Sequence, residues 1–178
     1  MNIRAFNKTT PNLAEGVYVD DTALVIGDVK IGPDSSVWPM TVIRGDVHYI
    51  RIGSGTNIQD HSVLHVSHDS EFEPGGHPLE IGNNVTIGHQ TVLHGCTVGN
   101  NCMIGMGSMV MDGAVIQKEV ILGAGSLVTP NKTLESGYLW MGRPAKKVRA
   151  LTAQEKEQLE YSARHYMKLK NDYLESNR

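Results

Sequence analysis

The chain contains 178 residues, of which 40% are hydrophobic and 20% are charged, and its formal net charge is -3. This length suits one folded domain with an appendage, and the apolar content argues against disorder. The near-neutral charge argues against nucleic-acid binding, and no apolar run reaches the roughly 18 residues of a membrane helix. Two cysteines, Cys96 and Cys102, are too few for a disulfide framework, so we expect a cytoplasmic protein.

The first 18 residues are expected to form an N-terminal arm. Residues 1–16 are polar and include Pro11, so we expect no signal peptide. From Val19 an apolar residue recurs every six positions, and after a three-residue interruption following Ile43 the frame resumes at Ile52. It continues, with one slip of one position after Leu93, as far as Val128.

A second column of small or β-branched residues stands four positions after the apolar one. Its members are Ser35, Thr41, Val47, Thr56, Ser62, Val85, Thr91, Thr97, Cys102, Ser108, Ala114, Val120 and Ser126. A period of six with both columns in frame predicts an all-β fold, the left-handed parallel β-helix of hexapeptide repeats, over residues 19–150. Such a chain forms a prism with three flat faces and 18 residues per coil, and both columns point inward. Gly and β-branched residues suit the corners and the short strands of this prism.

Two segments depart from the repeat. Residues 66–79 contain Pro74, Gly75, Gly76 and Pro78 and fit no frame, so we expect a protruding loop. Near the C-terminus, Thr152 and Glu155 form a capping box, and helical periodicity predicts a helix within residues 151–178, along the outside of the prism.

The histidines can be assigned to faces of the prism by counting. Seven of the eight lie between His48 and His94. We name face A after the repeat that carries Ile43, and faces B and C after the two repeats that follow. His65 and His94 each follow an inward residue on face A, one coil apart, so they should point outward at a spacing of about 4.8 Å. His89 falls on face C.

This arrangement suggests a metal site shared between subunits. A zinc site needs at least three protein ligands, and one face of the prism supplies only two imidazoles. A threefold trimer would set face A of one subunit against face C of the next and so bring His65 and His94 to the neighbour's His89. Arg44, in the same column as His65, would then meet the neighbour's Asp60, which stands at the position equivalent to His89. The alternative is a column of stacked surface histidines without a metal.

Other candidates are less regular. His48 lies near Arg44 and Asp46, so it is a candidate for the rim of the site. Cys96 lies two residues after His94, and we expect it to be a buried thiol. The alternative is that it binds the metal.

Several segments together resemble the signature of gamma-class carbonic anhydrases. They are Arg44-Gly45-Asp46, Asn57-Ile58-Gln59-Asp60, His65, Ile87-Gly88-His89 and His94-Gly95-Cys96. The resemblance extends through Ile104-Gly105-Met106-Gly107 and Asp112-Gly113 to the helical tail, so it covers nearly the whole chain.

The resemblance implies a homotrimer that hydrates CO2 reversibly to bicarbonate with a metal at each subunit interface. Zn2+ is the expected metal, with Fe2+ or Co2+ as alternatives. The implied ligands are His65, His89 and His94. The implied catalytic residues are Gln59, which would touch water or bicarbonate, Asp46 and Asn57, which line the site, and Tyr161 on the tail helix. Arg44 and Asp60 would bridge subunits.

The sequence also departs from the family pattern. Val47 stands where archetypal members carry a glutamate after the Asp46 position, and the stretch after His65 has no counterpart of their proton-shuttling glutamate. Because a proton must leave during hydration, His48 and His68 become the candidates for a relay.

Two other classes of function remain open. A hexapeptide-repeat acyltransferase would need a coenzyme A groove and a catalytic histidine without a metal trio, and a metal-dependent thioesterase is a near variant. A non-catalytic metal-binding trimer would need only the closed interface. Metal content separates the acyltransferase from the others, and a CO2 hydration assay separates the enzyme from the scaffold.

Overall fold

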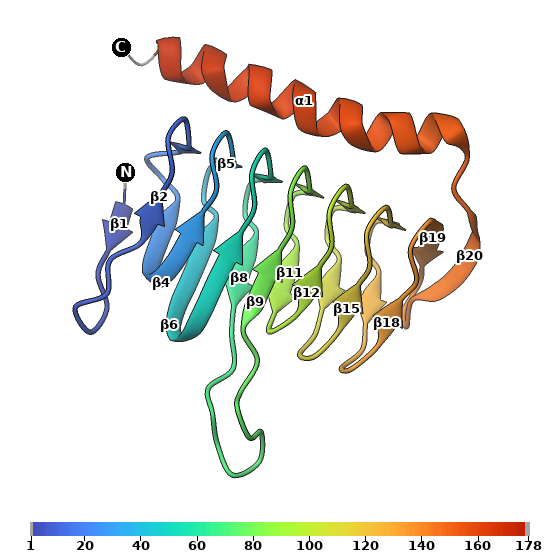
Figure 1. The fold of residues 1–178 in the computed structure, drawn as a ribbon, viewed down its shortest axis with the longest axis horizontal. Coiled ribbons are helices and arrows are strands. Elements are labelled where there is room, and N and C mark those ends of the chain that lie inside the picture. The colour runs from blue at the N-terminus through green and yellow to red at the C-terminus, as the bar shows by residue number, and fades with distance from the viewer. Residues whose placement is uncertain (1, 177–178) are drawn as a thin grey trace.

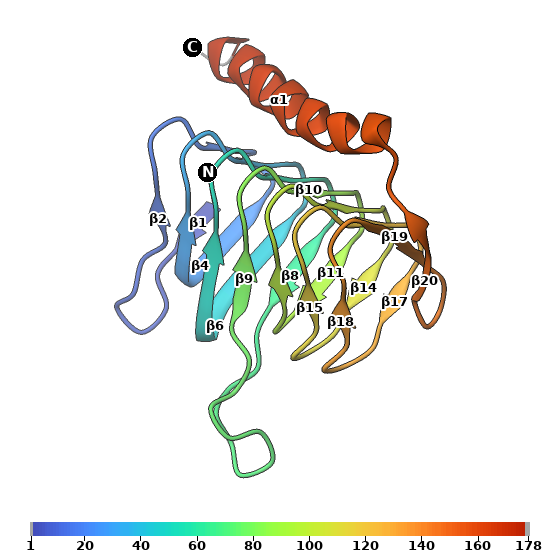
Figure 2. The ribbon, with the colours of Figure 1, turned by 45° about the vertical axis from the view of Figure 1, so that its right-hand side comes forward.

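The computed structural model describes residues 2–176 and has the fold that the repeat predicts, a left-handed parallel β-helix followed by a C-terminal helix (Figures 1 and 2). Met1 and residues 177–178, which the expected arm and tail helix included, lie outside this range. No helix among the described residues combines the length and the apolarity that crossing a bilayer requires.

Faces A and B belong to one continuous sheet, because two long strands run around the corner between them. These are β4 (Leu24–Ile31) and β6 (Val42–Ile52). Face A adds β1 (Asn2–Arg4), β8 (Val63–His65), β11 (Val92–His94), β14 (Met109–Val110) and β17 (Leu127–Val128). Face B adds β2 (Asn12–Leu13), β9 (Leu79–Ile81), β12 (Thr97–Val98), β15 (Val115–Ile116) and β18 (Thr133–Leu134). The N-terminal segment thus contributes β1 and β2, both paired parallel with β4.

Face C is a separate sheet that ends in an antiparallel hairpin. It contains β3 (Tyr18–Val19), β5 (Ser36–Val37), β7 (Asn57–Ile58), β10 (Thr86–Ile87), β13 (Met103–Ile104), β16 (Ile121–Leu122), β19 (Tyr138–Met141) and β20 (Lys146–Ala150). Only β19 and β20 pair antiparallel within this sheet. Val19 pairs with Val37, 18 positions on, which is the coil length that three hexapeptides predict.

The interior is built from the two inward columns. The apolar column is fully buried at positions such as Ile43, Leu64 and Leu93. Hydroxyl groups of the small column are satisfied by backbone carbonyls, because Thr41 donates to Gln59 O at 3.0 Å and Thr56 to Gly82 O at 2.8 Å. These hydroxyls in the narrow core are therefore paired, so their burial carries no free-energy penalty for an unmade hydrogen bond.

Two members of the small column were predicted wrongly. Val47 is 46% exposed, because three extra residues turn the chain outward at the corner between faces A and B. Thr97 is exposed as well, because the next coil is one residue shorter and Cys96 takes the inward place.

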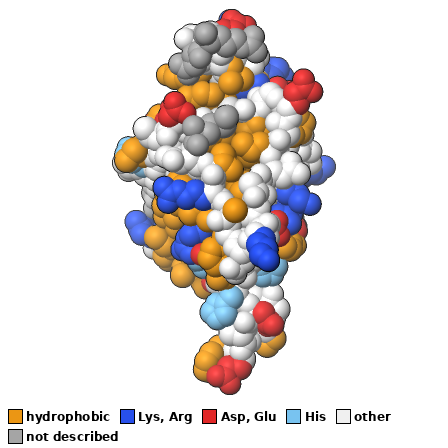
Figure 3. All heavy atoms as spheres, turned by 90° about the vertical axis from the view of Figure 1, so that its left-hand side faces the viewer, with side chains coloured by type: hydrophobic (Ala, Val, Ile, Leu, Met, Phe, Trp, Pro, Cys, Tyr) orange, Lys and Arg blue, Asp and Glu red, His pale blue; other side chains and the backbone are white. Residues whose placement is uncertain are grey.

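The corner between faces A and B carries both irregular insertions. In β6 the register with β4 shifts: Gly27 pairs with Gly45, 18 positions on, but Val29 pairs with Ile50, 21 positions on. One coil later the same corner holds the protruding loop between β8 and β9 (Figure 1). Viewed from the end of the prism, acidic side chains gather at the tip of this loop and histidines lie nearer its base (Figure 3).

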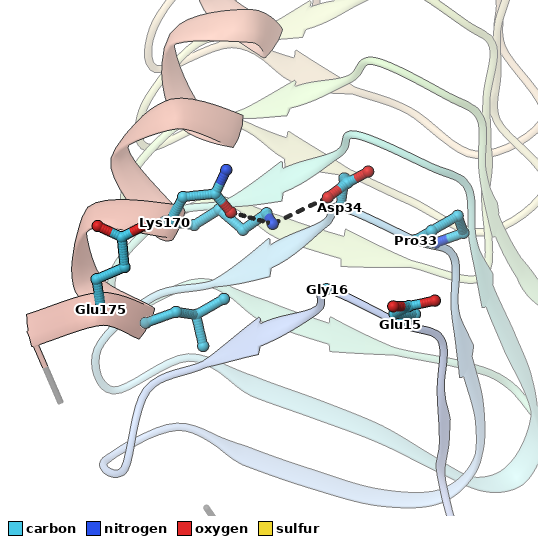
Figure 4. A pocket seen from close by; sticks show the side chains of 8 residues that line it. Glu15, Gly16, Pro33, Asp34, Lys170 and Glu175 are labelled. Atoms are coloured by element: carbon cyan, nitrogen blue, oxygen red, sulfur yellow. Dashed lines mark hydrogen bonds and ion pairs between the residues drawn. The ribbon is translucent and has the colours of Figure 1, made fainter. Parts of the chain in front are cut away.

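Helix α1 (Ala153–Ser176) runs back along face C and contacts β3, β5, β7 and β10 (Figure 1). It begins with the predicted capping box, because Thr152 N donates to Glu155 Oε2 at 2.9 Å and Glu155 N donates to Thr152 Oγ1 at 3.2 Å. Near its far end Lys170, with a side chain only 2% exposed, donates to Asp34 Oδ1 at 3.0 Å and Asn171 Oδ1 at 2.7 Å (Figure 4). The contact with Asp34 joins the helix to the first coils.

Candidate metal centre

A pair of histidines projects from face A where β8 and β11 end. His65 and His94 are direct partners in the strand register, as counting predicted, and each follows a fully buried leucine. Their side chains are 18% and 35% exposed. His65 Nδ1 lies 3.0 Å from His94 Nε2, so the two imidazoles turn one nitrogen each toward a common point.

The other nitrogen of each ring is held by a carboxylate. His65 Nε2 lies 3.0 Å from Asp46 Oδ1, and His94 Nδ1 lies 2.6 Å from Asp112 Oδ1. An ionised carboxylate only accepts hydrogen bonds, so both outer nitrogens carry the proton and donate it. When both rings are neutral, the two inner nitrogens carry lone pairs that face each other.

Local electrostatics favour the neutral form of His65. Burial lowers the pKa of His65, although the nearby Asp46 opposes the shift. Burial raises the pKa of Asp46, but hydrogen bonds from Arg44 and His65 outweigh that effect and leave its pKa below the ordinary value. A neutral imidazole beside an ionised aspartate is the form that binds a metal.

The spacing of the two inner nitrogens suits two of the ligands of a zinc ion. Two nitrogens bound tetrahedrally to one zinc at about 2.05 Å lie roughly 3.3 Å apart, close to the 3.0 Å found between the two rings. A shared cation also relieves the repulsion between the facing lone pairs. Carboxylates on the outer nitrogens are the usual second partners of metal-binding histidines.

His89 is separate from this pair. It lies on the turn after face C, where its Nδ1 is 2.9 Å from Asp60 Oδ2, and the side chains are 45% and 35% exposed. Arg44 contacts Asp46 at 2.5 Å, so within one chain it does not pair with Asp60. In the described part of one chain, no group of three His, Cys, Asp or Glu side chains is placed to hold a metal.

A buried polar network joins the predicted residues Gln59 and Asn57 to helix α1. Gln59 Nε2 donates to Asn57 Oδ1 at 3.1 Å, and Asn57 Nδ2 donates to Thr86 Oγ1 at 3.0 Å. The Thr86 hydroxyl in turn lies 2.9 Å from the Ser162 hydroxyl of α1. Gln59, Asn57 and Thr86 are all buried. The sequence analysis missed Thr86 and Ser162, although Thr86 lies in the same strand column as Asn57.

No contact described in the structure joins Tyr161 or His68 to the histidine pair. Tyr161 is 61% exposed, and its ring stacks on that of His165 with centroids 6.0 Å apart. It is Tyr166 of the same helix that packs on Trp38 of the prism, at 5.6 Å. His68 is exposed on the protruding loop.

His48 and Cys96 are engaged elsewhere. The Tyr49 amide donates to His48 Nδ1 at 2.8 Å, and His48 Nε2 donates to Gly75 O of the loop at 3.2 Å. His48 lines a hollow of about 390 Å³ together with Asp46. Cys96 is buried, and burial raises the pKa of its thiol far above the ordinary value, which suits a core residue.

Comparison with known proteins identifies the family. Residues 95–130 match the bacterial transferase hexapeptide (six repeats) model. The chain is 51% identical to protein YrdA of Escherichia coli over 97% of this chain and 94% of that protein. It is 41% identical to a carbonic anhydrase of Geobacillus kaustophilus (93% and 87% covered) and 45% identical to gamma carbonic anhydrase 1 of Arabidopsis thaliana (99% and 63%). The chain belongs to the gamma carbonic anhydrase-like family of hexapeptide-repeat proteins.

Solved structures agree on the fold of this family member but carry other names. A hexapeptide transferase family protein from Anaplasma phagocytophilum is 43% identical with a TM-score of 0.89, covering 97% of this chain and 98% of that one. A structure named as a putative acetyltransferase from Bacillus cereus is 38% identical with a TM-score of 0.90, covering 96% and 95%.

Proposed function

We propose that this carbonic anhydrase-like protein is a homotrimer that hydrates CO2 reversibly to bicarbonate at a metal centre shared between subunits. His65 and His94 of one subunit and His89 of the next would supply the ligands. The observation that carries the proposal is the pair of imidazoles whose facing nitrogens lie 3.0 Å apart while Asp46 and Asp112 hold the outer nitrogens.

Zn2+ is the proposed metal, with Fe2+ or Co2+ as alternatives that the same nitrogen ligands accept. His65, His89 and His94 would hold the zinc, which when bound would lower the pKa of water to about 7 and so supply hydroxide at neutral pH.

The chain's own residues would orient the substrate and carry the proton away. The amide nitrogen of Gln59 donates to Asn57, which leaves its carbonyl oxygen free to accept a hydrogen bond from water or from the hydroxyl group of bicarbonate. Arg44 holds Asp46 and would bridge to the neighbour's Asp60. His48 is the better-placed relay, because it lines the hollow beside Asp46. To accept a proton at Nδ1, the nitrogen that carries its lone pair, it would have to release the Tyr49 amide. Tyr161 is proposed only on the family resemblance, and His68 is the second candidate for the proton relay.

The surface of face A supports a homotrimer. Beside the histidine column runs an outward column of apolar side chains in strand register: Val42, Val63, Val92, Met109 and Leu127. Val63 is 42% exposed and Met109 is 37% exposed in the single chain. A contiguous apolar stripe next to an incomplete metal site is what an interface between copies would cover.

A hexapeptide-repeat acyltransferase is the second candidate, favoured by the names of the two solved structures. It would need no metal and would bind coenzyme A. A metal-dependent thioesterase shares the metal but acts on an acyl thioester, and a non-catalytic trimer would bind metal without turnover.

The deciding experiment combines metal analysis of anaerobically purified protein with stopped-flow CO2 hydration. We expect one metal per subunit and a rate that rises with pH through about 7. His65→Ala, His89→Ala and His94→Ala should each lose metal and activity, whereas His165→Ala, at an exposed helix position, should lose neither. Hydration that survives exhaustive chelation, or coenzyme A binding by a metal-free native protein, would favour the acyltransferase instead.

A further inference from the structure

We propose that the protruding loop sets the geometry of the metal centre through Ser67, a positioning residue for His94 that acts by way of Asp112. The inference rests on the proposed metal site and adds to it two residues and a structural role for the loop. Ser67 lies two positions after His65, where the chain leaves β8 to enter the loop.

Both oxygens of one carboxylate are engaged at this point. Asp112 Oδ1 accepts from His94 Nδ1 at 2.6 Å, and Asp112 Oδ2 accepts from the Ser67 hydroxyl at 3.0 Å. A carboxylate held at one oxygen can rotate about its side-chain bonds, whereas one held at both keeps its plane. The hydroxyl of Ser67 therefore restricts the direction from which Asp112 meets the His94 ring.

The base of the loop is itself fixed, so Ser67 is a firm anchor. Ser67 and His77 form an antiparallel bridge, with Ser67 N donating to His77 O at 3.1 Å and His77 N donating to Ser67 O at 3.0 Å. The His77 ring lies 3.0 Å from Glu73 Oε2. The two ends of the loop are thus joined to each other beside Asp112.

The close approach of loop and prism depends on Gly95. A Cβ built there would collide with Asp112 Oδ1 and lie 2.6 Å from His77 Cβ. Its φ of +50° is also one that other residues rarely adopt. The glycine directly after His94 thus leaves room for Asp112 and the loop base to meet at the histidine.

Such outer contacts matter for a metal ligand. The partner on the second ring nitrogen fixes the tautomer and orientation of the imidazole and raises its basicity, and losing it typically weakens metal affinity by about 10- to 100-fold. Ser67 is one hydrogen bond further from the His94 ring than Asp112 is. The effect of losing Ser67 on metal affinity should therefore lie at the lower end of that range.

The test measures zinc affinity of the trimer by competition with a chromophoric chelator, together with the visible spectrum of the Co2+-loaded protein. We expect Asp112→Asn to weaken zinc binding by about 10- to 100-fold and Ser67→Ala by about tenfold, with an altered Co2+ spectrum in both. Ser67→Thr, which keeps the hydroxyl, should restore both readouts. Ser70→Ala is the matched control in the same loop, because the Ser70 hydroxyl contacts only the Glu73 amide among the bonds described.

Each outcome decides a different question. Native affinity and spectrum in Ser67→Ala and Asp112→Asn would overturn this inference and leave the proposed metal site standing. An equal loss in Ser70→Ala would overturn the specific role of Ser67, because any disturbance of the loop would then suffice. A native trimer that binds neither zinc nor Co2+ would overturn the proposed function and this inference together.

Discussion

At the scale of single residues, the site relies on side chains whose hydrogen-bonding capacity is divided between structure and function. Asn57 illustrates this, because its oxygen accepts from Gln59 while its nitrogen donates to Thr86. With Asn57 only 1% exposed, neither group can turn to water instead. Burial therefore makes the orientation of the Gln59 amide a consequence of the Thr86 hydroxyl.

Replacing that hydroxyl should have a measurable cost. Thr86→Val keeps the shape of the side chain and the preference for a strand but leaves Asn57 Nδ2 buried without its acceptor, so we expect a loss of about 1–3 kcal/mol in the free energy of unfolding. Ser162→Ala removes the helix contact alone and should cost less, because Asn57 keeps its partner. Urea denaturation of both variants compares them, and a larger loss for Ser162→Ala would contradict the order of the network.

At the scale of secondary-structure elements, helix α1 begins where charge and capping act together. Glu155 accepts from the Thr152 amide and forms a two-oxygen pair with Arg149, at 2.8 Å for each contact. The Arg149 hydrogen bonds, reinforced by Thr152, lower the pKa of Glu155 to about 2. This pKa lies below the ordinary value of 4.5, so the ionised form is favoured in the folded chain.

The sign of the pH dependence follows from that shift. The contribution of Glu155 is fully present above about pH 4.5 and is lost as the pH falls toward 2. Glu155→Gln should lower the thermal midpoint at neutral pH, with a gap to the native protein that narrows through this window in scans of ellipticity at 222 nm. Glu157→Gln, an exposed acid in the same turn, is the control, and a gap that stays constant down to pH 2 would contradict the assignment.

At the scale of the whole molecule, the three faces of the prism carry different tasks. Face A presents the histidine pair and the apolar stripe, whereas face C carries His89 and is covered in part by α1. Two of the three proposed ligands therefore lie on face A and the third lies at face C. Only a heterologous contact between copies of the chain can bring them together.

Mixing two defective variants tests this division. His89→Ala and His94→Ala homotrimers should each bind metal poorly, because every site lacks one ligand. After subunit exchange at equal amounts, a site with face A from His89→Ala and face C from His94→Ala has all three ligands, and random assembly gives about a quarter of sites this composition. Metal content of the exchanged trimers is the measurement. Recovery of none, in trimers whose exchange is verified by mass, would mean that each chain holds its own ligands.

The repeat architecture and the facing histidines follow from the order of the amino acids alone. Each hexapeptide adopts nearly the same local structure, so counting residues is enough to place His65 beside His94 and His89 on another face. The capping box of α1 was equally predictable, because Thr152 and Glu155 are three residues apart and act locally.

The surroundings of those histidines depend instead on contacts between segments far apart in the chain. Asp112 lies 18 residues beyond His94 and Ser67 lies 45 residues before Asp112, and the stacking of coils at the inserted corner brings the three together. Thr86 meets Ser162, 76 residues away, because α1 folds back over face C. The three extra residues in β6 turned Val47 out of the interior, against the periodic pattern. A repeat fixes positions within its period, but insertions, loops and the returning helix break that period, and their contacts depend on packing between distant segments.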